Sequence, residues 1–402
     1  MSEWEWVPAG TAVTQRKDIV QLANDVEYRT MGVRWYGKGA YDRGVGTTKT
    51  IKAKRLYRAS AGDFVFNRID THKGAFDVVP DRLDGALATN EFPLYRTNPA
   101  RLMARFLLLY FQQETVLRTI ENSRSGSEGR ARWKEADFEG WKIPLPPIGE
   151  QRRILAVVDA VDRKVSSAEV EARQLDRVLA KIQAEIPDAP ERYVGDLLFS
   201  IDSGKSVRAL GDTPVIGKPR ILKLSAIRPS SFDASEGKYI EDITPFSGSH
   251  VVQEGDLLIT RSNTPDRVGY VAMARDVPRD TYMPDLMWRL RPDPEKVRVD
   301  YLEHVFASSR LRARVTATAS GTSQSMRKIN KAGFSKVLVP VPSLEDQKEY
   351  ADQCAAVAAS VKAIRTEIDR LRAVRSGLVN ALLSREVQVD GALAEFVKEK
   401  GA

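Results

Sequence analysis

The stretch that decides the fold occurs twice in this chain. The first copy is FEGWKIPLPPIGEQRRI, Phe138 to Ile154, and the second is FSKVLVPVPSLEDQKEY, Phe334 to Tyr350. Each copy has an aromatic residue, a short apolar run, Pro-x-Pro, three residues, an acidic residue and then glutamine. Matching positions lie 196 residues apart, namely Pro144 and Pro340, Pro146 and Pro342, Glu150 and Asp346, and Gln151 and Gln347. A register kept over this distance indicates an internal repeat.

The repeat extends upstream of the doubled phrase. AGDFVFNR (Ala61–Arg68) matches EGDLLITR (Glu254–Arg261) at an offset of 193, and SGS (Ser125–Ser127) matches SGT (Ser320–Thr322) at an offset of 195. Small loop insertions explain why the offset drifts. Each unit therefore has a variable β-rich region, a Gly-Asp strand, a basic Ser-Gly loop, Pro-x-Pro and then a helix.

Bulk composition limits the class of protein. With 402 residues, of which 42% are hydrophobic, the chain is long enough for two or more globular domains. We find no apolar run of the roughly 18 residues that a membrane helix needs and no signal-peptide pattern in MSEWEWVPAG. The single Cys354 and the scattered His72, His250 and His304 predict no disulfide and no metal site. These features favour a reducing cytoplasm.

Positive charge is concentrated in two segments. The net charge is +8 and the pI is near 9.4. Ten Lys and Arg against three Asp give residues 31–73 a charge of +7, and residues 308–331 hold six Lys and Arg with no acid. One such segment is as typical of a solvated face as of a binding surface. Two of them in repeated units favour a nucleic-acid partner.

The apolar patterns predict an α+β fold. FVF, LLI, VVP, FPLY, YVAM and MWRL are typical of strands, whereas residues 101–120 and 300–315 are typical of packed helices. We predict two mixed α/β domains in tandem repeat, at residues 1–145 and 189–341. Two long helices separate them and form an antiparallel coiled coil. The central helix falls within residues 146–188, and the distal helix with a C-terminal tail falls within 342–402.

Heptad spacing identifies the two long helices. The first seam runs without a break through positions 154, 158, 161, 165, 168, 172, 175, 179, 182 and 186. The second runs through Cys354, Val357, Val361, Ile364, Ile368 and Leu371, and then, after one register slip, through Val374, Leu378 and Leu382. Ser343 and Asp346 have the spacing of an N-terminal capping box. The alternative, two ordinary core helices, does not need so long a heptad series.

The motifs of a catalytic protein are missing. We find no G-x-x-x-x-G-K-[ST] loop, no G-x-G-x-x-G spacing in GKGAYDRGVG, and no Asn/Asp-Pro-Pro-aromatic motif for a base flipped beside S-adenosylmethionine. His72 near Asp70 is more typical of a surface turn than of an acid–base pair. We therefore predict a binding protein without catalytic residues.

Tandem globules that each end in PLPPIGEQ or PVPSLEDQ and a long helix resemble the specificity subunit of type I restriction–modification systems. RWYGKGAY, FVFNRIDTHKGAFDVVP and ATNEFPLY resemble a first target-recognition domain, and EGDLLITRSNTPDRVGYVA with SGTSQSMRKI resembles a second. The resemblance covers nearly the whole chain. Two positions depart from the pattern: Asp346 replaces the usual Glu, and the first Ser-Gly loop is SGSEGRARW where a Thr-Gln form is usual.

The resemblance implies a non-catalytic subunit that recognises a split, asymmetric site in double-stranded DNA. Partner subunits would carry out adenine-N6 methylation and restriction. The implied partners are two methyltransferase subunits, which bind the cofactor S-adenosylmethionine, and the sequence leaves open whether two motor-nuclease subunits join for cleavage. An alternative is a specificity subunit of a related methylation or defence system with different catalytic partners.

Candidate DNA contacts are polar or basic residues near strand ends and loops. Arg and Lys suit guanine and phosphate, whereas Asn and Gln suit adenine. In the first domain the candidates are Arg34, Tyr36, Lys38, Arg43, Arg68, Lys73 and Asn90. In the second they are Lys223, Ser225, Arg228, Arg261, Asn263, Arg267, Ser323, Gln324 and Arg327. Arg68 and Arg261 lead both sets because each ends its Gly-Asp strand; the alternative for either is a structural salt bridge.

Overall fold

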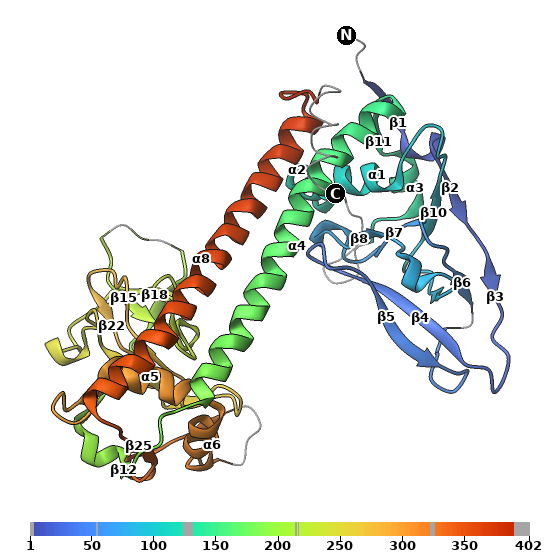
Figure 1. Ribbon diagram of the computed structural model, residues 1–402. Helices are drawn as coiled ribbons and strands as arrows, with labels where there is room; N and C mark the ends of the chain where they lie inside the picture. The colour runs from blue at the N-terminus through green and yellow to red at the C-terminus, as the bar shows by residue number, and fades with distance from the viewer. Residues whose placement is uncertain are drawn as a thin grey trace. The chain divides into compact units, whose positions relative to one another are not determined.

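The computed structural model describes residues 4–53, 55–123, 132–213, 215, 217–321 and 326–389 (Figure 1). The chain divides into two compact units: Met1–Ser167 with Ile368–Ala402, and Ala168–Glu367. Each long helix contributes one part to each unit, because α4 spans Ile148–Ala184 and α8 spans Leu344–Leu383. The first Ser-Gly loop, Ser125–Ser127, lies outside the described residues.

The first unit is built on a four-stranded antiparallel sheet in the order β2-β10-β7-β8. Its strands are β2 (Val13–Arg16), β10 (Leu94–Thr97), β7 (Phe64–Phe66) and β8 (Phe76–Val78). Helices α1 (Ala104–Phe111), α2 (Glu114–Ser123) and α3 (Glu135–Gly140) add their apolar faces to one aromatic core with this sheet. The doubled phrase supplies β11 (Lys142–Leu145), which pairs with β1 (Glu5–Pro8).

We call the four-stranded sheet with its three helices the frame of the unit. A second sheet forms a lobe on this frame. Its order is β3-β6-β9-β4-β5, and its bounds are β3 (Ile19–Val20), β6 (Leu56–Arg58), β9 (Leu87–Ala88), β4 (Tyr28–Arg34) and β5 (Gly39–Gly46). A small core that includes Met31, Val33 and Leu83 holds the lobe together. The β4–β5 hairpin is its longest feature, and Figure 1 shows it extending as a ribbon.

The second unit repeats the frame with the same sheet order, β13-β23-β19-β21. Its strands are β13 (Leu198–Ser203), β23 (Met287–Pro292), β19 (Leu257–Thr260) and β21 (Val271–Met273). Helices α5 (Val299–Ala307), α6 (Ser309–Ala317) and α7 (Lys331–Ser335) share its core, and β12 (Glu191–Tyr193) pairs with β25 (Leu338–Pro340) of the doubled phrase. The predicted repeat is therefore a repeat of folded structure.

The lobe of the second unit differs from that of the first. It has one sheet in the order β14-β18-β15-β22, formed by β14 (Ala209–Gly211), β18 (Gly237–Ile240), β15 (Arg220–Leu222) and β22 (Thr281–Tyr282). Two short pairs complete it: β16 (Ile227–Arg228) with β17 (Ser231–Phe232), and β20 (Ser262–Asn263) with β24 (Arg327–Lys328). Two like frames thus carry two unlike lobes.

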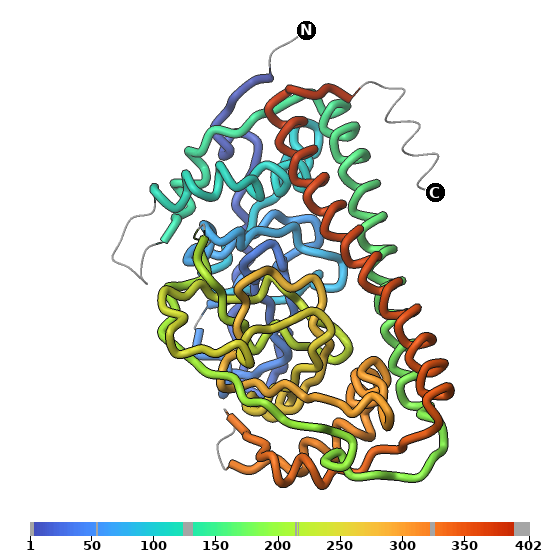
Figure 2. The backbone as a smooth tube through the Cα atoms, turned by 90° about the vertical axis from the view of Figure 1, so that its left-hand side faces the viewer, coloured from blue at the N-terminus to red at the C-terminus, as the bar shows by residue number. Residues whose placement is uncertain are grey.

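In each unit a part of α4 packs antiparallel against a part of α8 (Figure 2). Arg375 pairs with Asp162 at 2.5 Å in the first unit, and Arg365 pairs with Asp176 at 2.8 Å in the second. All ten predicted seam positions of the first helix region are buried or half-buried. Ser343 caps α8 as predicted, because its Oγ accepts a hydrogen bond from Asp346 N at 3.2 Å. These observations confirm the first seam and the antiparallel pairing of the two helices within each unit.

The predicted register slip after Leu371 is wrong. Val374 is 58% exposed, and the seam instead continues through half-buried Arg375 to Leu378 and buried Leu382. Arg375 occupies the seam by burying its aliphatic stem while its guanidinium reaches Asp162. The heptad spacing is therefore uninterrupted, with a basic residue at one position.

Each of the two predicted inner helix segments is two helices. Residues 101–120 break at Gln112–Gln113 between α1 and α2, and residues 300–315 break at Ser308, whose Oγ accepts a hydrogen bond from Leu311 N and so caps α6. The predicted strands FVF, LLI and MWRL are confirmed. Three predicted strands are confirmed in part: YVAM without Tyr270, VVP only at Val78, and FPLY only at Leu94 and Tyr95. Within the described ranges, no helix has the length and apolar character that crossing a membrane requires.

Candidate nucleic-acid interface

Arg68 and Arg261 occupy the same place in the two frames. Each follows the Gly-Asp strand at the centre of its sheet. The backbone N–H and the carbonyl of each arginine are both hydrogen-bonded. Arg68 N donates to Glu91 O at 3.0 Å and Arg68 O accepts from Trp133 N at 2.9 Å; the matching bonds of Arg261 involve Leu286 O and Ile329 N, both at 2.9 Å. The guanidinium groups also match, because Arg68 Nη1 donates to Asn90 O at 3.3 Å and Arg261 Nη1 to Asp285 O at 3.4 Å.

The charge beside these two arginines differs. Arg68 Nε lies 3.5 Å from Glu135 Oε2, so the first guanidinium has a carboxylate partner. The residue 196 positions further on is Lys331, which begins α7 as Glu135 begins α3, and its Nζ donates to Ile201 O. Among the described residues, Arg261 forms no ion pair with a carboxylate; its guanidinium donates to a backbone carbonyl, that of Asp285, and lies 5.8 Å from the Trp288 ring centroid. The second arginine is therefore the one whose charge is available to a ligand.

Three candidates of the second unit, Arg261 and two others, lie close together. β20 begins directly after Arg261 in the chain. Its pairing with β24 places Asn263 opposite Arg327. Arg327 Nη2 donates to Ala319 O at 3.2 Å, and Asn263 Oδ1 accepts from Thr264 N at 2.9 Å. Arg261, Asn263 and Arg327 thus form one polar edge. Ser323 and Gln324, the other candidates of the second Ser-Gly loop, lie outside the described residues.

The turn after Asn263 carries Arg267, and the half-buried Arg312 holds this turn. Arg312 donates to Asp266 O and to Val268 O, both at 2.9 Å, and its guanidinium lies 4.3 Å from the Tyr270 ring centroid. Burial lowers the pKa of Arg312. Arg267 itself is exposed, with Asp266 at 3.5 Å. Arg312 was not among the predicted residues; its place in the acid-free run 308–331 was the only signal.

In the first unit, four candidates cluster at the turn of the β4–β5 hairpin. Tyr36 has a φ of +57° and is 70% exposed, and its backbone N donates to Lys73 O at 2.6 Å. Lys73 Nζ lies 4.8 Å from the Trp35 ring centroid and 3.1 Å from Asp70 Oδ1. Arg34 and Lys38 flank this turn and are exposed. The turn therefore presents an aromatic pair, Trp35 and Tyr36, among cations.

Arg43 lies further along the same ribbon. Gly32 leaves space on the opposite strand: a Cβ there would lie 3.1 Å from Arg43 Cδ and 3.0 Å from Tyr41 Cε1. The guanidinium of Arg34 lies 4.2 Å from the ring centroid of Tyr41, so Arg34, Tyr41 and Arg43 share one face of the ribbon. A β-ribbon of this kind fits the major groove of B-DNA.

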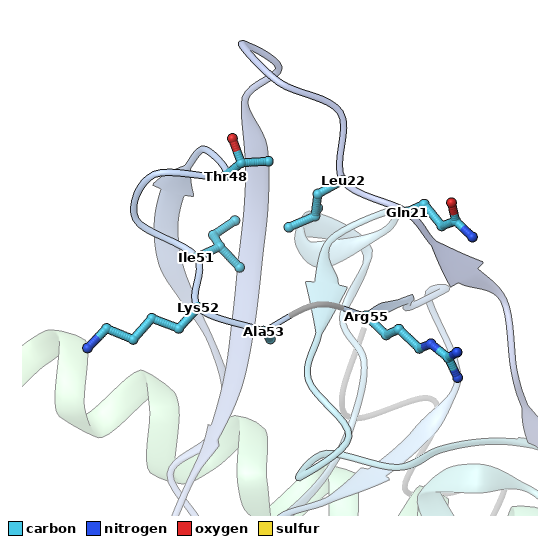
Figure 3. Close-up of a pocket in the computed structure, with 7 residues that line it drawn as sticks. All are labelled: Gln21, Leu22, Thr48, Ile51, Lys52, Ala53 and Arg55. Carbon is cyan, nitrogen blue, oxygen red and sulfur yellow. The ribbon is translucent and has the colours of Figure 1, made fainter.

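The open end of the ribbon has a shallow hollow of about 500 Å³ (Figure 3). Leu22 and Ile51 face each other across it, whereas Lys52 and Arg55 point outward. Gln21, Thr48 and Ala53 complete the lining. The outward cations make this end a surface suited to phosphate rather than a pocket for a small molecule.

Two further candidates are bonded to carboxylates of the second lobe. Lys223 Nζ lies 3.0 Å from Asp212 Oδ2 and 3.6 Å from Glu236 Oε2, and the hydrogen bond to Asp212 raises the pKa of Lys223. Ser225 Oγ donates to Glu236 Oε2 at 2.8 Å. The structure therefore gives Lys223 and Ser225 partners within the fold, whereas Arg228 and Asn90 are exposed.

The comparisons with known proteins agree with this architecture. Residues 79–176 and 199–371 match the family described as the type I restriction modification DNA specificity domain. The chain belongs to this family of specificity subunits. It is 22% identical over 307 residues to the type I restriction enzyme EcoKI specificity subunit of Escherichia coli K12, and 21% identical over 276 residues to the MjaVIII specificity subunit of Methanocaldococcus jannaschii. These matches cover 71% and 63% of this chain and 66% and 63% of the relatives, less than two thirds of either relative.

Solved structures show the same fold. A chain from a study of complex assembly and conformational transition of the type I R-M system aligns over 95% of this chain and 98% of its own length, with a TM-score of 0.56 and 19% identity. The type I S subunit from M. genitalium aligns over 94% and 96%, with a TM-score of 0.52 and 13% identity. The predicted α+β fold with two tandem domains is therefore confirmed.

Proposed function

We propose that this chain is the non-catalytic specificity subunit that recognises a bipartite, asymmetric DNA site and directs adenine-N6 methylation and restriction by its partners. The observation that carries the proposal is the pairing of like frames with unlike lobes. Each frame presents an arginine at the same backbone position, Arg68 or Arg261, and joins it to a lobe with its own sheet order. Two such modules would recognise two unlike half-sites.

The cations of the two units support DNA as the ligand. Arg261, Asn263 and Arg327 form an edge of donors and acceptors suited to base edges, and the β4–β5 ribbon presents Arg34 and Arg43 on one face. Phosphate contacts by Lys and Arg provide affinity, and base contacts provide sequence discrimination. In this proposal Lys223 and Ser225 shape the second lobe rather than touch DNA.

The catalytic groups belong to the partners in this proposal. Two methyltransferase subunits would bind S-adenosylmethionine and transfer its methyl group to adenine N6, while motor-nuclease subunits would cleave unmodified DNA. The paired parts of α4 and α8 would serve as the spacer and as the docking surface for the methyltransferases. Exposed Val170 and Val178 on α4 and exposed Val374 on α8 are apolar residues available for such docking.

Methylome mapping tests the proposal directly. The chain is co-expressed with the methyltransferase subunit of its own system in a host without adenine methylation, and methylated adenines are mapped by single-molecule sequencing. We expect two unlike short half-sites with a fixed gap and one methylated adenine in each. The methyltransferase alone is the control and should leave the DNA unmodified. Methylation at a single contiguous site would overturn the bipartite proposal.

Two further measurements separate the partner systems. Purified chain with S-adenosylmethionine and DNA should transfer no methyl group, and any transfer would show that the chain is itself an enzyme. Adding the motor-nuclease subunit and ATP to the methylating complex should give cleavage of unmodified DNA. Methylation without cleavage would indicate a related methylation or defence system.

A further inference from the structure

The glutamine of the doubled phrase is the most completely bonded polar side chain at the start of each long helix. Gln151 and Gln347 are both fully buried, and each is the fourth residue of its helix. Burying an amide is costly unless its donors and acceptor are bonded. Both amides meet this condition with three hydrogen bonds each.

The partners are the same in the two units. Gln151 Oε1 accepts from Met103 N at 2.8 Å, and its Nε2 donates to Arg101 O at 2.7 Å and to Pro146 O at 2.8 Å. Gln347 Oε1 accepts from Arg298 N at 2.8 Å, and its Nε2 donates to Lys296 O at 3.2 Å and to Pro342 O at 3.0 Å. The partner residues correspond at offsets of 195 or 196, so the arrangement is part of the repeat.

These three bonds connect the long helix to the frame, and we call them the joint of each unit. Met103 and Arg298 are the N-cap residues of α1 and α5, so each glutamine holds the start of a frame helix. Helix α1 packs on β7 and β8, and α5 packs on β21 in one core with β19. Strands β7 and β19 lead directly to Arg68 and Arg261. A continuous packed path therefore runs from each glutamine to each candidate reading arginine.

We propose that Gln151 and Gln347 are positioning residues. Each fixes the orientation of the candidate DNA-contacting arginine of its unit, Arg68 or Arg261, relative to the long helix, and so helps to set the gap between the half-sites. This inference rests on the proposed function. It assigns the spacing of the site to two buried amides in addition to the length of the helices. Loosening either joint should let the complex accept neighbouring gap lengths, while the bases of both half-sites stay the same.

The test uses Gln347→Asn and Gln151→Asn in the full chain with its methyltransferase partner. Asparagine keeps the amide but is one methylene shorter, so it cannot reach all three partners. The measured quantity is the ratio of methylation at sites with the gap changed by one base pair to methylation at sites with the native gap. We expect this ratio to rise about fivefold to tenfold, the factor that one lost hydrogen bond is worth.

Ser308→Ala is the matched control. It removes buried hydrogen bonds at the start of α6, within the second unit and away from the joint. It should lower methylation at all sites equally and leave the ratio unchanged. Gln347→Met, an apolar side chain of similar length, is the second joint variant and should raise the ratio as Gln347→Asn does.

Several outcomes would overturn the inference. An unchanged ratio with reduced total methylation, as in the control, would show that the glutamines only stabilise the fold. Complete loss of methylation in both Gln347 variants would also count against it, because a positioning role predicts methylation at altered gaps. A wild-type methylome without a bipartite motif would instead be a failure of the proposed function, and is distinguishable because it needs no variant.

Discussion

Arg68 and Arg261 have matching backbone bonds and matching guanidinium contacts, yet of the two only Arg68 has a carboxylate beside it in the described part of the chain, that of Glu135. The residue that differs is the first of a short helix, Glu135 in α3 and Lys331 in α7. The comparison shows that the frame fixes the position of the arginine, whereas one neighbouring residue determines whether a carboxylate balances its charge. The two units can therefore share a scaffold and still bind DNA with unequal strength.

The largest expected effect tests whether the core of each frame stabilises only its own unit. Phe138 and Phe334 are both fully buried, and each packs against other rings. Either change to Ala should cost about 3–5 kcal/mol, because it leaves a cavity in a packed core. Hydrogen exchange on the whole chain should show the loss in the first unit for Phe138→Ala and in the second for Phe334→Ala.

Phe199→Ala, at a residue that is 70% exposed, is the control for the ring deletions and should change protection little. If Phe138→Ala loosens both units equally, the two frames do not fold as separate units.

Arg261 provides the next largest effect. Arg261→Ala should weaken binding of the cognate site by about 1–3 kcal/mol, the usual worth of a bidentate contact with a base. Binding is measured on cognate and random duplexes at one salt concentration. Equal weakening on both duplexes would assign Arg261 to phosphate contact and remove its role in discrimination.

Arg68 should matter less, and Glu135 is the reason. Arg68→Ala should weaken cognate binding by less than Arg261→Ala does, whereas Glu135→Gln should strengthen it by up to about 1 kcal/mol, the range of a partly exposed ion pair. The same titrations measure both variants. If Glu135→Gln weakens binding of the cognate site alone, the carboxylate is itself a base contact, since Glu can accept from cytosine N4.

The smallest effect concerns the ribbon of the first lobe. Its strands have seven and eight residues, whereas the described strands of the second lobe have at most four. Lys52 points outward from the open end of this ribbon. Lys52→Ala should reduce the slope of log K against log[salt] by about 1, the value for one lost phosphate contact, equally for cognate and random DNA. Lys348→Ala on α8 is the control, and an equal change there would remove the special role of the ribbon.

The repeat and the fold could be predicted because the doubled phrase and the heptads are local patterns. Gln151 and Gln347 stood out in that phrase, but two of the three hydrogen bonds of each involve residues about 50 positions upstream, which no local pattern indicates. Arg375 was missed because apolar spacing cannot recognise a charged residue that buries only its stem. Glu135 was missed for a similar reason: a carboxylate matters there only through its distance from Arg68, and that distance exists only in the fold.

The division of α8 between the two units also has a consequence for biosynthesis. Val379, Leu382 and Leu383 belong to the core that contains Phe64 and Phe106, so the first unit needs residues near the end of the described chain. Every residue of the second unit precedes Ile368. During translation the second unit is therefore complete before the first, in contrast to the usual order in which N-terminal domains fold first. Until α8 emerges from the ribosome, the nascent first unit exposes the apolar surface around Ile154 and Val158.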